Sequence, residues 1–171
     1  GWLAVMDDGD IVMCHRTFGS NGYDVVLQRY EALDGATVWA TVYDGPTHGG
    51  DDVRDMVMDR QGNLLVAGVQ DAQWNYSYMA LKFDSTDGSL LWSAGYDGPP
   101  GWYDVANCIA EGPAGSVVVS GFSDGSGTGW DWATVAYDGL DGSPLWVQRF
   151  NGPAGQSDEA RDVVCTDQGE V

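Results

Sequence analysis

The residues best suited to chemistry in this sequence are tryptophans, aspartates and a histidine that fall between apolar segments. A tryptophan ring can stack on a sugar, and a neighbouring carboxylate can accept hydrogen bonds from the sugar hydroxyls. Loops on a rigid scaffold commonly carry function. We therefore predict a ligand-binding set, with carbohydrate as one ligand class, consisting of Trp74, Trp102, Trp130, His48 and Asp52. The alternative interpretation is that these tryptophans only pack between structural units.

A glycine-rich segment offers oxygen donors for a metal ion. Asp124 and Asp131 bracket the residues Gly-Ser-Gly-Thr-Gly-Trp, and carboxylates on a flexible loop suit Ca²⁺ better than a transition metal. The segment lacks the spaced carboxylates and terminal glutamate of an EF-hand, so an ordinary connection is the alternative. His15 and His48 have no Cys or His at ligand spacing, which argues against zinc. Calcium at Asp124 and Asp131 is the one metal site that we consider, and we expect no other cofactor.

Only one segment matches a motif for nucleophilic catalysis. Residues 121–125 read Gly-Phe-Ser-Asp-Gly, which fits the pattern G-x-S-x-G. That chemistry needs a strand–turn–helix elbow, an oxyanion hole and a positioned histidine, whereas this segment ends a strand-like run in an all-β sequence. Aspartate pairs can serve a glycosidase, but aspartate is abundant in this chain and common in turns. We therefore predict no catalytic residue.

The charge balance restricts the partners of the protein. The 171 residues include 26 acidic and 7 basic side chains, for a net charge of −19. This charge argues against a nucleic-acid or anionic-membrane partner. The 43% hydrophobic content can support a packed core, and no apolar run approaches the ~18 residues of a membrane-spanning helix. Gly1 is not followed by a basic-then-apolar segment, so we expect a processed or excised N-terminus.

The chain repeats itself with a period of 53 or 54 residues. The motif Tyr-Asp-Gly-Pro at 43–46 returns at 96–99 and, as Phe-Asn-Gly-Pro, at 150–153. The repeat residues that keep the same phase are the tryptophans Trp39, Trp92 and Trp146 and the glycines Gly9, Gly62, Gly115 and Gly169. A fixed period of this size indicates a repeat architecture such as a solenoid or a propeller.

Each repeat unit contains four short apolar runs. In the second unit we expect strands at 55–59, 64–68, 78–83 and 90–96, with Asp87-Gly88 as a hairpin turn. The runs are nearly continuous in apolar residues, which indicates sheets that are buried on both faces. Four-stranded antiparallel units that cover one another in this way indicate a β-propeller. We predict an all-β fold with blades at 1–46, 47–99 and 100–153 and the first strand of a further blade at 154–171.

Two segments carry a family resemblance. Residues 55–68 resemble the bacterial seven-bladed β-propeller repeat, through the pattern D-x-x-G-N-x-x-V-x-G that runs from Asp59 to Gly68. Residues 83–92 resemble the tryptophan-docking motif of quinoprotein-type propellers, which ends at Trp92. The resemblance covers nearly the whole chain and implies a bacterial protein of the periplasm or the cell exterior. It does not imply pyrroloquinoline quinone, because the docking motif is structural.

A repeated architecture without a catalytic constellation favours a non-enzymatic scaffold of an exported bacterial protein that binds a ligand, a protein or a glycan. One alternative is a fragment of a propeller enzyme, quinoprotein-like or glycan-cleaving, whose active centre lies in other blades. Another is a partial propeller that assembles with itself. Three blades are fewer than the four to eight that close a ring. The expected partners are therefore further blades of a longer chain, which we favour, or other copies of this chain.

Overall fold

The computed structural model describes residues 1–71, 75–99, 102–166 and 171, and this part of the chain is almost entirely β-structure. Its twelve strands form three four-stranded antiparallel sheets, each built from strands that are consecutive in the sequence. The first sheet contains β1 (Trp2–Val5), β2 (Ile11–Phe18), β3 (Tyr23–Tyr30) and β4 (Thr37–Tyr43). The second contains β5 (Asp51–Met58), β6 (Leu64–Asp71), β7 (Tyr76–Phe83) and β8 (Leu90–Tyr96). The third contains β9 (Asp104–Glu111), β10 (Val117–Gly125), β11 (Gly129–Tyr137) and β12 (Pro144–Phe150), with the short 3₁₀ helix η1 (Pro113–Gly115) between β9 and β10.

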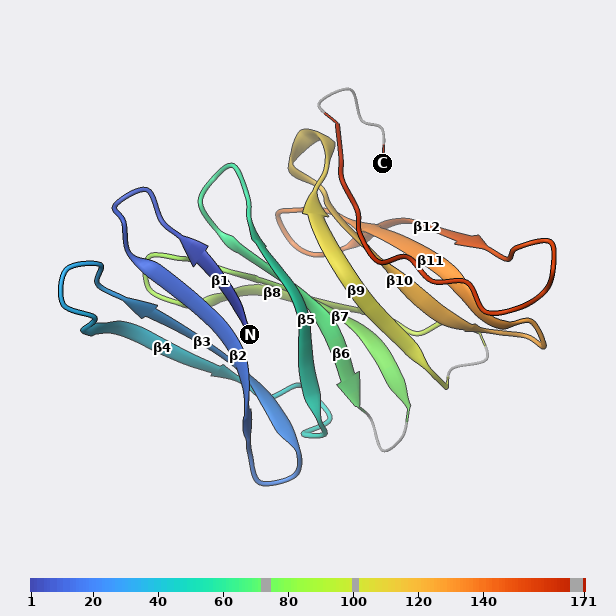
Figure 1. The fold of residues 1–171 in the computed structure, drawn as a ribbon, viewed down its shortest axis with the longest axis horizontal. Coiled ribbons are helices and arrows are strands. Elements are labelled where there is room, and N and C mark those ends of the chain that lie inside the picture. Colours follow the sequence, from blue (N-terminus) through green and yellow to red (C-terminus); the bar gives the residue numbers. More distant parts are fainter. Residues whose placement is uncertain (72–74, 100–101, 167–170) are drawn as a thin grey trace.

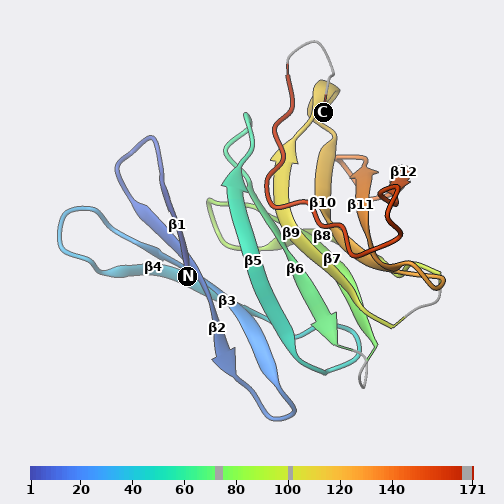
Figure 2. The ribbon, with the colours of Figure 1, turned by 45° about the vertical axis from the view of Figure 1, so that its right-hand side comes forward.

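The three sheets stand side by side in sequence order (Figure 1). The first strand of the middle sheet, β5, contacts β1 and β9, the first strands of its neighbours. The last strand of each sheet lies at the opposite edge, and Figure 2 shows the sheets as separate layers. This is the arrangement of neighbouring propeller blades, so the prediction of an all-β partial propeller is confirmed.

The middle blade is buried on both faces, which explains its unbroken apolar runs. In β6, Leu64 and Val66 join the core shared with the first blade, whereas Leu65 and Ala67 join the core shared with the third. All four are fully buried. Met13 occupies the position of Val66 in the first blade, one period earlier, and is 38% exposed. The outer face of the first blade is therefore more exposed at this position than the same face of the middle blade.

Tryptophans fasten each blade to the next one. Trp39 Nε1 donates a hydrogen bond to Ser85 O at 3.0 Å, and Trp92 Nε1 donates one to Gly139 O at 3.1 Å. Both carbonyls belong to the turn between the third and fourth strands of the following blade. Trp146 holds the same repeat position in the third blade and is 39% exposed.

The repeat glycines lie in the turns between the first and second strands of each blade. Gly9, Gly62 and Gly115 have φ values of 90°, 84° and 78°, a conformation that glycine adopts without a Cβ clash. Gly169, the fourth member of the series, lies outside the described residues.

After β12, residues 151–166 follow the third blade without joining a ladder. Asn107 Nδ2 donates to Ala160 O at 2.9 Å, and the Ala160 N–H donates to Gly121 O at 3.1 Å. The first strand of each sheet pairs only with the second strand of the same sheet. This segment, predicted to open a further blade, therefore has no ladder partner among the described residues. Among the described residues, no helical segment has the length and hydropathy needed to span a bilayer.

Candidate functional site

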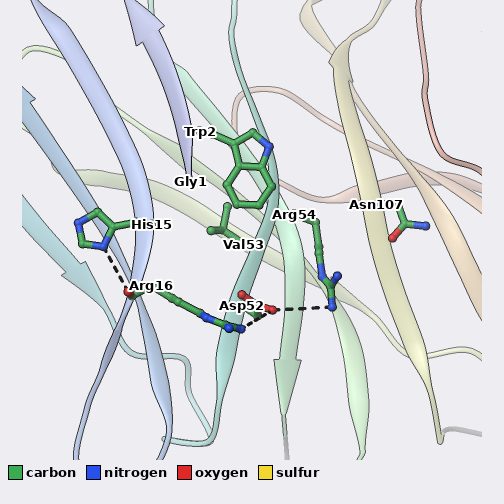
Figure 3. Close-up of a pocket in the computed structure, with 8 residues that line it drawn as sticks. All are labelled: Gly1, Trp2, His15, Arg16, Asp52, Val53, Arg54 and Asn107. Atoms are coloured by element: carbon green, nitrogen blue, oxygen red, sulfur yellow. Dashed lines mark hydrogen bonds and ion pairs between the residues drawn. The ribbon is translucent and has the colours of Figure 1, made fainter.

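A cavity of about 550 Å³ lies where the first and second blades meet (Figure 3). Its walls come from β1 and β2 of the first blade, from β5 of the second and from β9 of the third. The residues that line it are Gly1, Trp2, His15, Arg16, Asp52, Val53, Arg54 and Asn107. The cavity therefore combines an indole, an imidazole, two guanidinium groups, a carboxylate and an amide.

A repeated β-bulge places two of these side chains. In β5, Val53 pairs with Gly68 and Asp55 pairs with Ala67, so Arg54 has no partner across the ladder. The third blade has the same irregularity at Asn107, 53 residues later. A bulge re-aims the side chain of its extra residue, and both of these side chains line the cavity.

The charged groups meet at Asp52. Its Oδ2 lies 2.9 Å from Arg16 Nη1 and 3.7 Å from Arg54 Nη2, as Figure 3 shows. The side chains of Arg16 and Arg54 are 47% and 46% exposed, so their remaining donors face solvent. The Arg16 guanidinium carbon also lies 4.3 Å from the centroid of the Tyr23 ring, a cation–π contact. Two positive groups thus share one carboxylate at the surface of a strongly acidic chain.

A second cavity of about 360 Å³ adjoins the first and shares Arg16, Asp52 and Arg54 with it. We call the two cavities together the interblade groove. Four aromatic side chains line the second cavity: Phe18, Tyr23, Tyr76 and Tyr103. The Tyr76 and Tyr103 rings meet edge to face with centroids 4.9 Å apart. Apolar ring faces beside a few charged groups are typical of small-molecule sites.

The predicted ligand-binding residues do not all gather in this groove. Asp52 lines both of its cavities. Trp130 instead stacks on Phe122, with ring centroids 4.6 Å apart, which favours the packing interpretation for this tryptophan. Trp102 is 66% exposed and lines neither cavity. Trp74 lies outside the described residues.

His48 lies in the loop between β4 and β5. Its Nδ1 is 2.8 Å from Asp44 Oδ2, and this hydrogen bond, with the negative charge of Asp44, raises the pKa of His48 above its usual value. His48 lines neither cavity of the groove.

At the two predicted calcium ligands, the Asp131 carboxylate and the Asp124 backbone carbonyl are engaged with other groups. Asp131 Oδ1 accepts a hydrogen bond from Thr128 Oγ1 at 2.8 Å, and Asp131 Oδ2 forms an ion pair with Arg149 Nη2 at 3.1 Å. The backbone carbonyl of Asp124 accepts a hydrogen bond from the same guanidinium at 2.7 Å. Calcium at Asp124 and Asp131 stays a prediction, and Arg149 already supplies a positive charge there.

The serine of the G-x-S-x-G segment does not stand on an elbow. Ser123 lies inside β10, opposite Asp131 in the ladder, and its Oγ is hydrogen-bonded to Arg149 Nη1. The segment belongs to an antiparallel sheet and is not followed by a helix.

Arg16, Arg54, Tyr76 and Tyr103 line the groove but were not predicted from the sequence. A signal for Arg54 was available, because Arg54, Asn107 and Arg161 keep the repeat phase at intervals of 53 and 54 residues. Large polar side chains on the first strand of successive blades would face the same side of the molecule. The aromatic residues had no such signal, because β-strands of any function are rich in tyrosine.

Comparisons with known proteins add little beyond this geometry. No protein-family model matches the sequence, and no curated protein matches it. Among solved structures, the chain is similar to the crystal structure of BamB from Moraxella catarrhalis, with 14% sequence identity and a TM-score of 0.42. The match covers 92% of this chain and 50% of that chain, so this chain spans half the length of that protein. Such a likeness carries no argument about function, and the blade assignment rests on the strand order described above.

Proposed function

We propose that this chain is a non-enzymatic β-propeller scaffold of an exported bacterial protein and that it binds carbohydrate in the interblade groove. One observation carries the proposal: four aromatic side chains meet the Arg16–Asp52–Arg54 group in one cavity of about 360 Å³. Aromatic faces stack on sugar rings, while guanidinium and carboxylate groups donate and accept hydrogen bonds to hydroxyls. The repeat resemblance supports the bacterial and exported parts of the proposal.

A glycan array followed by calorimetry with the best glycan tests this proposal. Tyr23→Ala removes a ring that lines the groove, and Asp52→Asn removes the charge that holds Arg16. Each change should weaken binding by about tenfold, the effect of losing roughly 1.4 kcal/mol of contact. Trp102→Ala is the matched control, because Trp102 is an exposed aromatic residue outside both cavities.

Two results would overturn the groove as the binding site. The first is the absence of binding to every glycan on the array. The second is binding that survives Tyr23→Ala and Asp52→Asn but is lost in Trp102→Ala, which would place the ligand on the loop tryptophans instead.

Assembly through the open blade faces is a second candidate function, and Trp146 favours it. Trp92, its equivalent, is 6% exposed because the third blade covers it, whereas Trp146 is 39% exposed. At the other end, a Cβ on Gly35 would meet nothing within 4 Å, whereas one on the equivalent Gly88 would lie 2.6 Å from the Trp39 ring. The first blade therefore presents a receiving turn and the third blade presents a tryptophan. We propose that a further blade of this repeat, from a longer chain or from a second copy, joins the two.

Sedimentation over a concentration series tests whether copies of this chain use these surfaces. Trp146→Ala and Gly35→Asn should each lower the association constant, because asparagine tolerates positive φ yet fills the space for the indole. Trp102→Ala should leave association unchanged. A chain that stays monomeric throughout would exclude assembly of copies and leave a further blade of a longer chain as the partner.

A further inference from the structure

Three carboxylates from separate segments converge between the first and second blades. They belong to Asp24 in β3, Asp44 in the loop after β4, and Asp51 at the start of β5. One carboxylate oxygen from each lies within 4.8 Å of the others. Three like charges at this distance repel one another unless a cation or protons compensate them.

Asp51 gives the cluster a buried and unsatisfied oxygen. The residue is 1% exposed, and its Oδ2 accepts a hydrogen bond from the Gly45 N–H at 2.7 Å. Its Oδ1 is buried and has no hydrogen-bond partner. Buried polar groups are normally paired, so an orphaned oxygen on a member of this acidic cluster points to a missing positive ligand.

The electrostatics agree with the geometry. Burial, together with the charges of Asp44, Asp24 and Asp71, raises the pKa of Asp51 to about 6, against the hydrogen bond from Gly45. The ionised form of Asp51 therefore experiences repulsion from its acidic neighbours. A divalent cation would remove this repulsion.

The junction between the second and third blades, which we call the second junction, shows how the charge at the same repeat position is compensated elsewhere in the molecule. Asp104 is the repeat equivalent of Asp51, 53 residues later, and its Oδ2 accepts from the Gly98 N–H at 3.2 Å. Asp104 Oδ1 also lacks a hydrogen-bond partner, and burial raises the pKa of Asp104 too. There, however, the Ser123 hydroxyl and the positive charge of Arg149 act to lower the pKa of Asp104.

Two repeat positions near these carboxylates differ between the junctions. Ser77 stands at the second junction where Asp24 stands at the first. Arg149 stands at the second where Gly95 stands at the first. At these two positions the first junction has an added carboxylate and lacks the Arg149 guanidinium, which at the second junction pairs with Asp131.

Glycines leave room for the carboxylates to converge. A Cβ on Gly45 would lie 2.8 Å from Asp51 Oδ1, and a side chain on Gly19 would overlap the Asp24 carboxylate. Asp44 is exposed and uses one oxygen for His48 Nδ1, which leaves the other for a cation.

We propose that Asp24, Asp44 and Asp51 form a calcium site that joins the first blade to the second. Ca²⁺ accepts six to eight oxygen ligands in flexible geometry, whereas Mg²⁺ demands a near-ideal octahedron. Three carboxylates from three segments, completed by water, suit the larger ion. The site borders the interblade groove, because Asp51 also lines the smaller cavity, but it does not depend on carbohydrate binding. It is distinct from Asp124 and Asp131.

The test is thermal unfolding of the chelator-treated chain with and without Ca²⁺, together with Tb³⁺ luminescence. Tyr23 and Tyr43 are the sequence neighbours of two of the ligands and can sensitise bound Tb³⁺. Calcium at ten times its Kd should raise the Tm by about 3–5 °C. Asp24→Asn, Asp44→Asn and Asp51→Asn should each abolish the shift and the luminescence. The matched control, Asp104→Asn, should keep both, and Asp44→Asn keeps the test decisive if Asp51→Asn does not fold, because Asp44 is exposed.

Two kinds of result would overturn the calcium site. No luminescence and no Tm shift in the unmodified chain would overturn the proposal, as would shifts of full size in Asp24→Asn and Asp44→Asn. An equal shift with Mg²⁺, or loss of the shift in Asp104→Asn as well, would indicate general screening of the −19 charge and would also overturn it.

Discussion

The junction between the first and second blades and the junction between the second and third blades use the same tryptophan contact, but they differ in how they balance charge. In the first, Trp39 docks on Ser85 O; in the second, Trp92 docks on Gly139 O. A cation also donates to each of these carbonyls, Arg29 in the first and Lys82 in the second. The repeated backbone and the docked tryptophan thus define where two blades meet.

The ionic groups around this shared framework are individual to each junction. Lys82 is 5% exposed and forms an ion pair with the buried Asp59 at 2.9 Å, whereas Arg29 is bound by Asp8 and Asp10 at the surface of the first blade. Near the other end of the strands, Arg149 compensates the second junction and no equivalent arginine is present in the first. Blade docking therefore tolerates different charge arrangements, so the first junction can accommodate a bound cation.

Removing a docked tryptophan should produce the largest effect. Trp92→Ala should lower the free energy of unfolding by about 3–5 kcal/mol, because it deletes a buried indole and leaves a cavity between blades. Trp146→Ala should cost less than about 1 kcal/mol in the monomeric chain, since the same side chain is exposed there. Urea denaturation measures both, and equal losses would contradict the docking role.

Removing the Arg149 guanidinium should make the charge balance of the second junction resemble that of the first. Arg149→Met should lower the free energy of unfolding by about 2–4 kcal/mol, because Asp131 and the Asp124 carbonyl lose a partly buried charged partner. Arg161→Met is the control, since the Arg161 side chain is 83% exposed. Chemical denaturation that shows no difference between the two variants would argue against compensation by Arg149.

Alanine substitutions at Gly88 and Gly35 should separate the steric contact with a docked tryptophan from the strain of a positive φ. Gly88 and Gly35 have nearly the same φ, 76° and 74°, so alanine strains both turns equally. Gly88→Ala also places its Cβ against the Trp39 ring and should cost about 2–3 kcal/mol in total, whereas Gly35→Ala should cost about 1 kcal/mol. Thermal unfolding of the two variants measures the difference, and equal losses would mean that the Trp39 contact is loose.

Acid should weaken the ion pair of the second junction. Burial alone raises the pKa of Asp59, but hydrogen bonds from Lys82 and Asn63 outweigh it, so the pKa lies below its usual value. A carboxyl with a depressed folded-state pKa stabilises the protein above its unfolded pKa of about 4 and loses that contribution as the pH falls through the folded value. Asp59→Asn should therefore cost about 1–3 kcal/mol at neutral pH, and the cost should shrink below about pH 4.

Denaturation of the unmodified and Asp59→Asn chains across this pH range provides the measurement. A penalty that stays constant with pH would show that the carboxylate charge does not contribute.

Most of the fold could be predicted because its signals are local and repeated. The hairpin turn at Asp87-Gly88 and the apolar runs around it locate β7 and β8 closely. The hairpin of β5 and β6 extends beyond its predicted ends, to Asp51 and Asp71, because ladder pairing continues past the apolar core. Apolar content marks the buried part of a strand, whereas hydrogen bonding determines its length.

The site was harder to predict. Asp52 was expected to bind ligand and lies in the groove, but Trp130 packs on Phe122 instead. Whether a loop aromatic faces solvent or a neighbouring ring depends on loop conformation, for which the repeat carries no information. The bulge that directs Arg54 into the cavity has no marker residue of its own.

The sequence by itself determined the period, the four strands of each blade and the burial of both faces of the middle one. Each of these follows from side-chain type and spacing along a single strand or turn, so one repeat unit encodes it. Only the tertiary structure decided which charges meet: Asp24 and Asp51 come together across two blades, and Arg149 reaches Asp131 across one sheet. Electrostatic energy depends on distance through space, and equivalent positions in neighbouring repeats have different side chains around them.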